Sequence, residues 1–227
     1  MGQRSMQLSE RDRSLLAWIG EQYTVRVDLL AVLMAQHSDN PDAKLRGRLR
    51  HQTVSRRLSA WKAAGLVRSQ TFLAGTSATL WLTAEGMSVA GLPWRTYEPT
   101  LATCAHRHAV GLVRAEAEAM GLGWICEREL REGLGGSPLH LPDGVVLSTD
   151  DTGKQWRTAV EVELTRKTEA RVAAILRQLL KTYDDVVYRA HPSAATVVQR
   201  AASALPGGGA GRVHVRSYPP PALAGVA

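Results

Sequence analysis

Residues 140–149 read His-Leu-Pro-Asp-Gly-Val-Val-Leu-Ser-Thr, and residues 155–164 read Gln-Trp-Arg-Thr-Ala-Val-Glu-Val-Glu-Leu. Between them, residues 150–154 read Asp-Asp-Thr-Gly-Lys, and nearly all of these residue types favour turns. The apolar run after Pro-Asp-Gly and the alternation after the turn are both typical of strands. The stretch therefore predicts a β-hairpin.

Three carboxylates belong to this hairpin. Alternation places Glu161 and Glu163 on the same face of the second strand, and Asp143 stands at the start of the first strand. Acids held close together repel, so a cluster of this kind persists when a cation lies among the oxygens or one group keeps its proton. The alternative interpretation is an ordinary Pro-Asp-Gly turn beside a solvated strand face.

Helical and strand-like patterns alternate through the rest of the second half. Apolar periodicity predicts two helices that would cover a sheet and one shorter helix near the end. The segments are a helix over 101–120, a strand entering a loop over 124–130, a helix over 169–183, a strand over 186–189, a helix over 194–204 and a strand over 213–217. This order predicts a mixed sheet with helices on its faces.

Composition separates the two halves of the 227-residue chain. The net charge is +7, and residues 1–95 hold thirteen Lys/Arg against seven Asp/Glu, whereas the remainder is nearly balanced. Clustered basic charge favours a nucleic-acid partner. Two cysteines give no disulfide framework, and neither a membrane-spanning run nor a signal peptide is visible. We therefore expect a cytoplasmic protein without a membrane partner.

The first half has the element order of a winged helix-turn-helix. We expect a helix capped by Ser9, a second helix capped by Thr24, a loop over 37–42 and a third helix over 52–66. Strands over 67–73 and 78–83 then form a hairpin, and Thr83-Ala84-Glu85-Gly86 begins a further helix. The predicted domains are 1–91 (winged helix), 92–100 (linker), 101–218 (α/β domain) and 219–227 (flexible tail).

The third helix is predicted to read DNA. Val54, Leu58 and Trp61 share its buried face, so the polar residues at its beginning point mostly away from the core. Arginine and glutamine at such positions read guanine and adenine in the major groove, while a preceding basic segment contacts phosphates. The predicted DNA contacts are Lys44, Arg46, Arg48, Arg50, Gln52, Thr53, Arg56 and Arg57. The alternative is a solvated face on a winged helix that binds another protein.

Short motifs carry a resemblance to a known family. Leu-Pro-Asp-Gly-Val, Val-Glu-Val-Glu-Leu-Thr and Lys-Thr-Tyr at 181–183, with the α-β-α-β order after the hairpin, resemble the PD-(D/E)XK restriction-endonuclease-like fold. With the winged helix in front, residues 9–217 resemble the actinobacterial replication-relaxation family. That resemblance implies a mixed α/β protein of two domains that acts in the replication, relaxation or transfer of plasmids and integrative elements.

The resemblance also implies site residues. Asp143 and Glu161 match the two metal-binding acids, which in an active nuclease hold Mg²⁺ with help from the Val162 carbonyl. Glu127 or Glu129 matches an earlier acid of the first core element. The predicted metal ligands are Asp143, Glu161 and, as a third candidate, Glu163.

The chain departs from the family pattern at the catalytic lysine. Glu163 stands where that lysine belongs, so the cation that stabilises the reacting phosphate is missing there. Arg166, Lys167 or Lys181 is a candidate replacement, and Lys167 is the one assigned to the predicted catalytic set with Asp143, Glu161 and Glu163. Alternatively, Glu163 is a metal ligand, or the site is inactive and only the fold is kept.

Three functions remain open at this stage. The first is a DNA-binding protein of a mobile element with a degenerate nuclease-like domain. The second is an active Mg²⁺-dependent nicking endonuclease, and the third is a winged-helix transcriptional regulator with a non-catalytic dimerisation domain. Duplex DNA is the expected partner, with a homodimer as a further candidate. Cys104, His106 and His108 are interpreted as core or interface residues, and 133–137 as a mobile connection.

Overall fold

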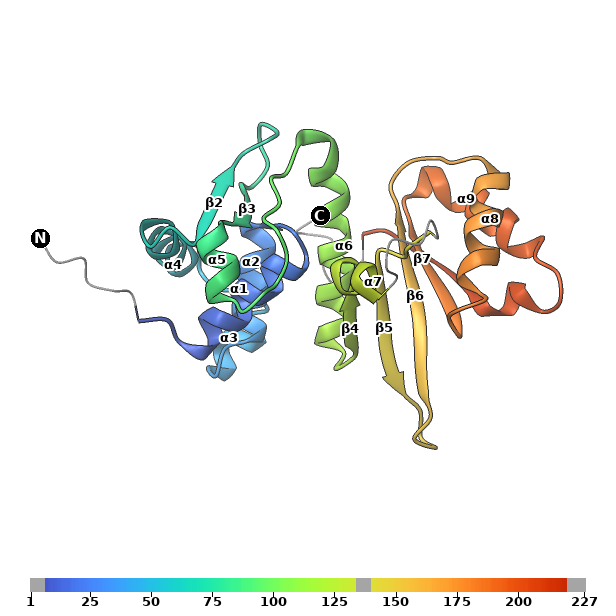
Figure 1. The fold of residues 1–227 in the computed structure, drawn as a ribbon, viewed down its shortest axis with the longest axis horizontal. Helices are drawn as coiled ribbons and strands as arrows, with labels where there is room; N and C mark the ends of the chain where they lie inside the picture. Colours follow the sequence, from blue (N-terminus) through green and yellow to red (C-terminus); the bar gives the residue numbers. More distant parts are fainter. Residues whose placement is uncertain (1–6, 134–139, 220–227) are drawn as a thin grey trace, which may run out of the picture. The chain divides into compact units, whose positions relative to one another are not determined.

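The computed structural model describes residues 7–133 and 140–219. The chain divides into two compact units, of which the first ends at Gly111 and the second begins at Leu112. The predicted linker, 92–100, lies inside the first unit, because the long helix that follows it contributes to both units. Each unit is described separately below (Figure 1). The predicted mobile connection lies mostly outside the described residues, as does most of the predicted tail.

The first unit packs helices against a small sheet. Its elements are α1 (Glu10–Glu21), β1 (Val25–Arg26), α2 (Val27–Gln36), α3 (Pro41–Leu45), α4 (His51–Ala63), β2 (Val67–Gln70), β3 (Thr79–Leu82), α5 (Ala84–Val89) and the first part of α6 (Leu101–Ala119). The three strands are antiparallel in the order β1-β3-β2. The predicted hairpin is confirmed by the antiparallel pairing of β2 with β3. The helix after it is confirmed as α5, where the Thr83 hydroxyl accepts a hydrogen bond from the Gly86 N–H.

Two predictions in this unit are wrong. Thr24 does not cap the second helix; a short strand, β1, pairs with β3 and displaces the helix start to Val27. The expected loop over 37–42 contains the beginning of α3, which Asn40 caps by accepting from the Asp42 N–H. The capping role of Ser9 is confirmed: Ser9 and Asp12 form reciprocal hydrogen bonds at the start of α1.

The second unit is built on a five-stranded mixed sheet. Its elements are the end of α6, β4 (Gly123–Cys126), α7 (Glu127–Gly133), β5 (Gly144–Thr149), β6 (Gln155–Glu163), α8 (Glu169–Leu179), β7 (Asp185–Ala190), α9 (Pro192–Ser203), a 3-10 turn (Gly209–Arg212) and β8 (Val213–Ser217). The strand order is β4-β5-β6-β7-β8, antiparallel up to β6 and parallel from β6 to β8. The predicted mixed sheet and the central hairpin are confirmed.

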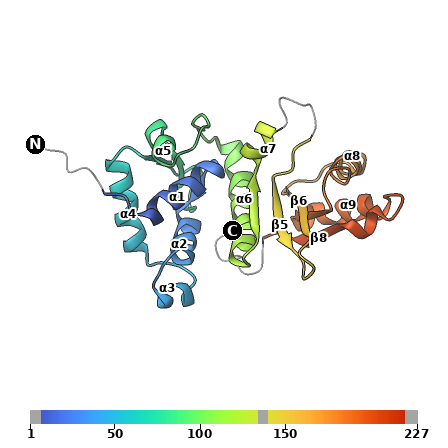
Figure 2. The ribbon, with the colours of Figure 1, turned by 60° about the horizontal axis from the view of Figure 1, so that its bottom comes forward.

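Helices cover both faces of this sheet. Leu176 of α8 and Val198 of α9 pack with Ala159 and Tyr188 of the sheet in one buried core. Figure 2 shows α8 and α9 side by side on that face. The end of α6 lies on the opposite face. The expected loop after Cys126 is wrong, because residues 127–133 form α7, where Arg131 pairs with Glu127 one turn away.

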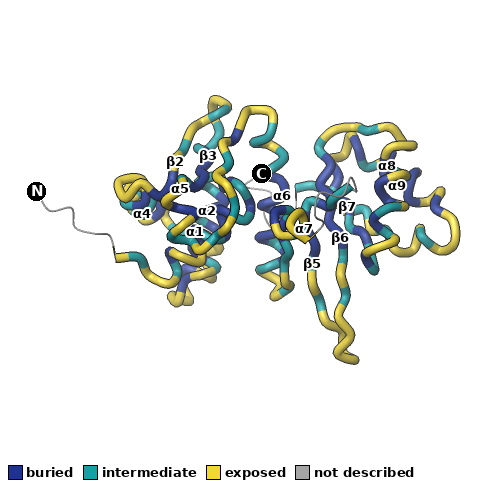
Figure 3. Tube along the Cα trace, in the orientation of Figure 1, coloured by how far each residue is buried: buried dark blue, intermediate teal, exposed yellow. Residues whose placement is uncertain are grey.

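Burial follows these layers. The first unit buries β3 and one side of each of α1 and α2, while the tip of the β5–β6 hairpin is exposed (Figure 3). Among the helices of residues 7–133 and 140–219, none is long and apolar enough to cross a membrane.

Candidate functional site

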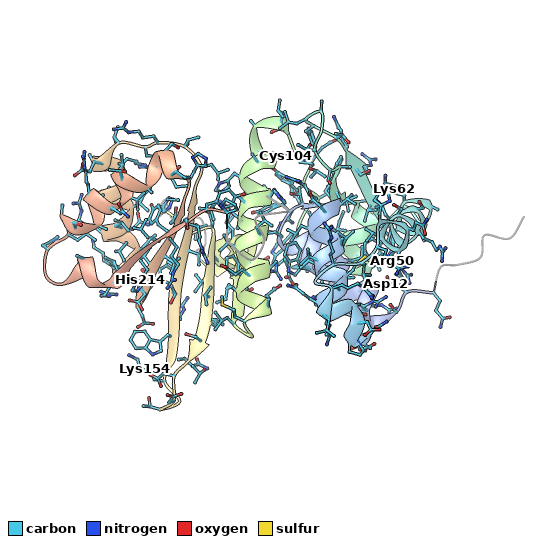
Figure 4. The ribbon with its side chains drawn as sticks, turned by 180° about the vertical axis from the view of Figure 1, so that it is seen from behind. Asp12, Arg50, Lys62, Cys104, Lys154 and His214 are labelled. Atoms are coloured by element: carbon cyan, nitrogen blue, oxygen red, sulfur yellow. The ribbon has the colours of Figure 1, made fainter. Side chains whose placement is uncertain are left out.

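Helix α4 presents a polar side that the core does not use. Val54 and Trp61 are buried, and Leu58 is only half-buried, so the predicted apolar face is narrower than expected. Gln52 and Thr53, near the start of the helix, are exposed. Figure 4 labels Arg50 and Lys62, which stand at the two ends of this helix. The side chains predicted to contact DNA are therefore accessible along its first turns.

Basic side chains dominate the segment that enters α4. All of them are exposed, and none forms an ion pair with another described residue. These residues are Lys44, Arg46, Arg48, Arg50 and Arg56. Because no described acid neutralises them, they form a surface of positive charge at the beginning of α4.

Arg57 differs from this group. Its Nη1 lies 3.3 Å from Oδ2 of Asp12, and the Asp12 side chain is only 2% exposed. The same carboxylate accepts hydrogen bonds from the N–H and hydroxyl groups of Ser9. Arg57 therefore neutralises a buried acid and joins α4 to α1, a structural role that the sequence did not reveal.

The acidic residues of the second unit gather where β6 ends. Glu161 pairs in register with Tyr188 of β7, and Glu163 pairs with Ala190. Since β5 runs antiparallel to β6, Asp143, which directly precedes β5, lies at the same end of the strands as the end of β6. We call Asp143, Glu161 and Glu163, with the partners described next, the acidic cluster.

Asp143 closes the end of the β5–β6 ladder. Its N–H donates to the Val160 carbonyl at 3.0 Å, and its Oδ2 accepts from the Val162 N–H at 2.8 Å. The carboxylate thus accepts the hydrogen bond that a main-chain carbonyl would accept if β5 began earlier in the chain. Part of the reason for an acceptor at this position is structural.

Glu161 is buried beside His140. The imidazole Nε2 lies 2.8 Å from Oε1 of Glu161, whose side chain is 5% exposed. Burial raises the pKa of Glu161 to about 7, and the negative charge of Asp143 also raises it. The hydrogen bond from His140 and the charge of Lys167 act in the opposite direction and lower this pKa. The hydrogen bond to Glu161 raises the pKa of His140 in turn. Sequence reasoning assigned no role to His140, although the residue stands in the stretch that predicted the hairpin.

Glu163 is paired with Lys167. The ammonium lies 2.5 Å from Oε2 of Glu163, which is 3% exposed, although the pair lacks the angles of a hydrogen bond. The charge of Lys167 also lowers the pKa values of Glu161 and His140. Of the three candidate cations, Lys167 is the one brought to the cluster; in the described structure Arg166 and Lys181 are exposed and pair with none of the acids.

Tyr188 adds a buried hydroxyl to the cluster. The residue is fully buried, and its oxygen has no hydrogen-bond partner among the described residues. Burial raises the pKa of Tyr188, and the charges of Glu161, Glu163 and Asp143 raise it further. The hydroxyl therefore keeps its proton. The sequence offered only a tyrosine within an apolar alternation, which is typical of a core residue.

The predicted metal set is divided among separate partners. Asp143 bonds the backbone, Glu161 faces His140 and Glu163 faces Lys167. No group of three or more His, Cys, Asp or Glu side chains that could hold a metal ion occurs within residues 7–133 and 140–219. Carboxylate oxygens suit Mg²⁺, but this arrangement does not present three of them to one ion. His140 and Lys167 lie beside two of the three predicted ligands, Glu161 and Glu163.

The remaining predicted acids stand on α7, which begins directly after Cys126, the register partner of Gly144. Glu127 pairs with Arg131 on α7, and Glu129 is exposed on the same helix. A separate cavity of about 730 Å³ lies between the end of α6 and the opposite sheet face, and Arg189 and Glu116 form an ion pair in its lining. None of the three cluster acids lines this cavity.

The burial of Glu161 predicts a pH-dependent stability. Its folded-state pKa of about 7 lies above the unfolded value of 4.5, so its contribution is full below 4.5 and is lost as the pH rises through 7. Glu161→Gln removes this titration. We expect the variant to gain stability relative to wild type between about pH 5 and about pH 8 in urea titrations. A constant difference across that range contradicts the prediction, and Glu169→Gln on the exposed start of α8 is the matched control.

Comparisons with known proteins give no match: no protein family, curated protein or solved structure corresponds to this chain.

Proposed function

We propose that this chain is a DNA-binding protein whose first unit docks α4 against duplex DNA. The observation that carries the proposal is the set of five exposed cations at the start of α4, none of which pairs with a described acid. Phosphates are the complementary partner, since each neutralised phosphate releases counterions into solution. Arg57, by contrast, pairs with Asp12 inside the fold and is not one of these five cations.

The order of elements supports the same conclusion. Four helices, of which α3 has only five residues, precede a hairpin, and α4 is the last helix before that hairpin, where a winged helix-turn-helix carries its recognition helix. Gln52 and Thr53 can then read base edges, and Arg50 and Arg56 can contact phosphates or guanine. Following the resemblance stated above, we place the protein on a plasmid or integrative element, in the replication, relaxation or transfer of its DNA.

Arg56→Ala tests the role of α4. We expect the variant to bind duplex DNA about 5- to 150-fold more weakly if the side chain reads a base. If it contacts a phosphate, the slope of log affinity against log salt falls by about 1. Fluorescence anisotropy over a salt series measures both quantities. Arg57 is unsuitable for this test, because its loss leaves Asp12 buried without its cation.

Arg177→Ala is the matched control, because this exposed arginine lies on α8 in the second unit. Unchanged affinity and an unchanged salt slope for Arg56→Ala would remove α4 from the proposed interface. Equal effects of both variants would reduce the proposal to a general attraction of a basic protein to DNA.

The second unit supports a second candidate function, a metal-dependent nicking endonuclease. Its order of one helix, three antiparallel strands, a crossover helix and a parallel strand is that expected for the nuclease-like fold. The specific observation in favour is that Asp143, Glu161 and Lys167 come close together near the end of β6. The opposing observation is that His140 and Lys167 already neutralise the acids, which favours a non-catalytic domain.

Nicking of supercoiled plasmid distinguishes these two roles. If the cluster is catalytic, the protein with Mg²⁺ or Mn²⁺ converts supercoils to open circles, and Asp143→Asn abolishes the conversion. Asparagine keeps an oxygen for the Val162 N–H but loses the charge that a metal needs, so the variant separates chemistry from folding. Because each acid has a protein partner, we expect wild-type protein to leave the plasmid supercoiled. Open circles that depend on Asp143 would establish the nuclease instead.

A further inference from the structure

The end of α3 and the residues that follow it form an exposed basic arm, which we define as residues 44–48, Lys-Leu-Arg-Gly-Arg. Both ends of the arm are attached to the first unit. Ala43 is 2% exposed, and the Leu49 N–H donates to the Ala31 carbonyl of α2 at 2.9 Å. Within the arm, the Gly47 N–H donates to the Lys44 carbonyl at 3.0 Å. The arm is therefore an exposed turn whose two ends are fixed to the first unit.

The tip of the arm is a glycine turn. Gly47 has a φ of +67°, and no atom beyond its two neighbouring residues lies within 4 Å of the position that its Cβ would occupy. The two flanking residues, Arg46 and Arg48, are exposed and form no ion pair with another described residue. A turn without a side chain at its apex fits the DNA minor groove, which is only about 6 Å wide and excludes a helix.

Leu45 distinguishes the arm from a surface that contacts phosphates alone. It is 85% exposed, more than any other large apolar side chain in the described ranges. Contacts to phosphate oxygens gain nothing from an apolar group, whereas minor-groove proteins use such groups against sugars and between base steps. Arginine suits the same groove, because its guanidinium is weakly hydrated and the narrow groove of A·T runs is strongly negative.

The arm lies close to the proposed major-groove helix. Arg48 precedes the first residue of α4, His51, by three positions, a span of at most about 10 Å. An arm this close to α4 can reach the phosphate backbone that borders the major groove, and the minor groove beyond that backbone. The nearby acids, Asp39 and Asp42, stand before or at the start of α3, and neither forms an ion pair with these arginines.

We propose that the basic arm enters the minor groove of an A·T-rich segment that flanks the site of α4, with Arg46 and Arg48 in the groove and Leu45 against its wall. The inference rests on the proposed DNA-binding function and adds the kind of DNA that the protein selects. It also changes the role of two arginines from positioning on phosphates to selection of sequence by groove shape.

The experiment begins with selection of preferred duplexes from a randomised pool by the full chain. We expect an A·T run beside a more specific core. Replacing one A·T pair of the run by G·C introduces an amino group into the minor groove, and we expect affinity to fall about 5- to 150-fold. Replacement by inosine·C, which lacks that amino group, should preserve affinity although the major-groove edge has changed.

Protein variants provide the second half of the test. Arg46→Lys with Arg48→Lys keeps the charge but removes the guanidinium groups, so we expect the discrimination against G·C to fall at least threefold while overall affinity remains. The matched control is Arg177→Lys with Arg200→Lys, the same change at exposed positions of the second unit. This control should retain the full discrimination.

The outcomes separate this inference from the function on which it rests. If no duplex is bound above background at low salt, both the DNA-binding proposal and the basic-arm proposal fail. If DNA is bound but the selected sites lack an A·T run, or inosine·C behaves as G·C does, only the minor-groove proposal is overturned. Full discrimination in the double lysine variant likewise overturns it and returns the arginines to phosphate contacts.

Discussion

Gly86→Ala is expected to lower the free energy of unfolding of the first unit by about 3 kcal/mol, because the site has no room for a methyl group. A Cβ at this position would lie 2.0 Å from the Leu66 carbonyl oxygen and 3.3 Å from Cβ of Leu82. The nearest obstacle is backbone, which cannot move aside as the end of a flexible side chain can. The substitution must therefore displace α5 or the beginning of β2.

Urea unfolding measures this effect, with Ser88→Ala as the control. Ser88 is exposed on the same short helix, so its replacement should change the midpoint little. The packing at Gly86 is reinforced by Thr83, whose N–H and hydroxyl donate to the carbonyls of Leu66 and Gly65. A Gly86→Ala protein as stable as wild type would show that this contact relaxes without cost.

Lys167→Met is expected to destabilise the second unit by about 2 kcal/mol, because it leaves Glu163 buried without its cation. Glu163 is 3% exposed, and the lysine is 37% exposed, so the cost is set below that of a fully buried pair. The two partners should differ in their effects. Glu163→Gln removes the buried charge and leaves a lysine that can turn to solvent, so we expect a much smaller loss.

The double variant Glu163→Gln with Lys167→Met completes this test. It should recover most of the stability that Lys167→Met loses, since no charge then remains buried without a partner. Chemical denaturation of all four proteins gives the coupling between the two positions. Additive effects would show that Lys167 does not neutralise Glu163.

Much of the architecture was predictable because its signals are local. The strand alternation at residues 159–163 placed Glu161 and Glu163 on one face, and the structure confirms the hairpin. The hairpin after α4 and the helices over the sheet are also confirmed, and they were predictable because their sequence signals are local as well. By contrast, β1 was missed because two residues carry no periodicity, and their strand exists only through pairing with β3.

The candidate site was less predictable, because its partners are remote in sequence. His140 reaches Glu161 across 21 positions, and the parallel register brings Tyr188 to the same carboxylate. Arg57 resembled its neighbour Arg56 in sequence, yet only Arg57 meets the buried Asp12. No local pattern distinguishes those two arginines, because the difference arises where α1 and α4 pack.

By itself, the sequence determined the mixed α/β class, the positions of most helices and strands, and the common face of the acidic residues. These properties follow from periodicity and turn chemistry within a few residues. Only the tertiary structure decided that each acid has its own partner and that Lys167 is the cation present. Charge pairing depends on distances between separate elements, and those distances are set when the sheet and its helices pack together.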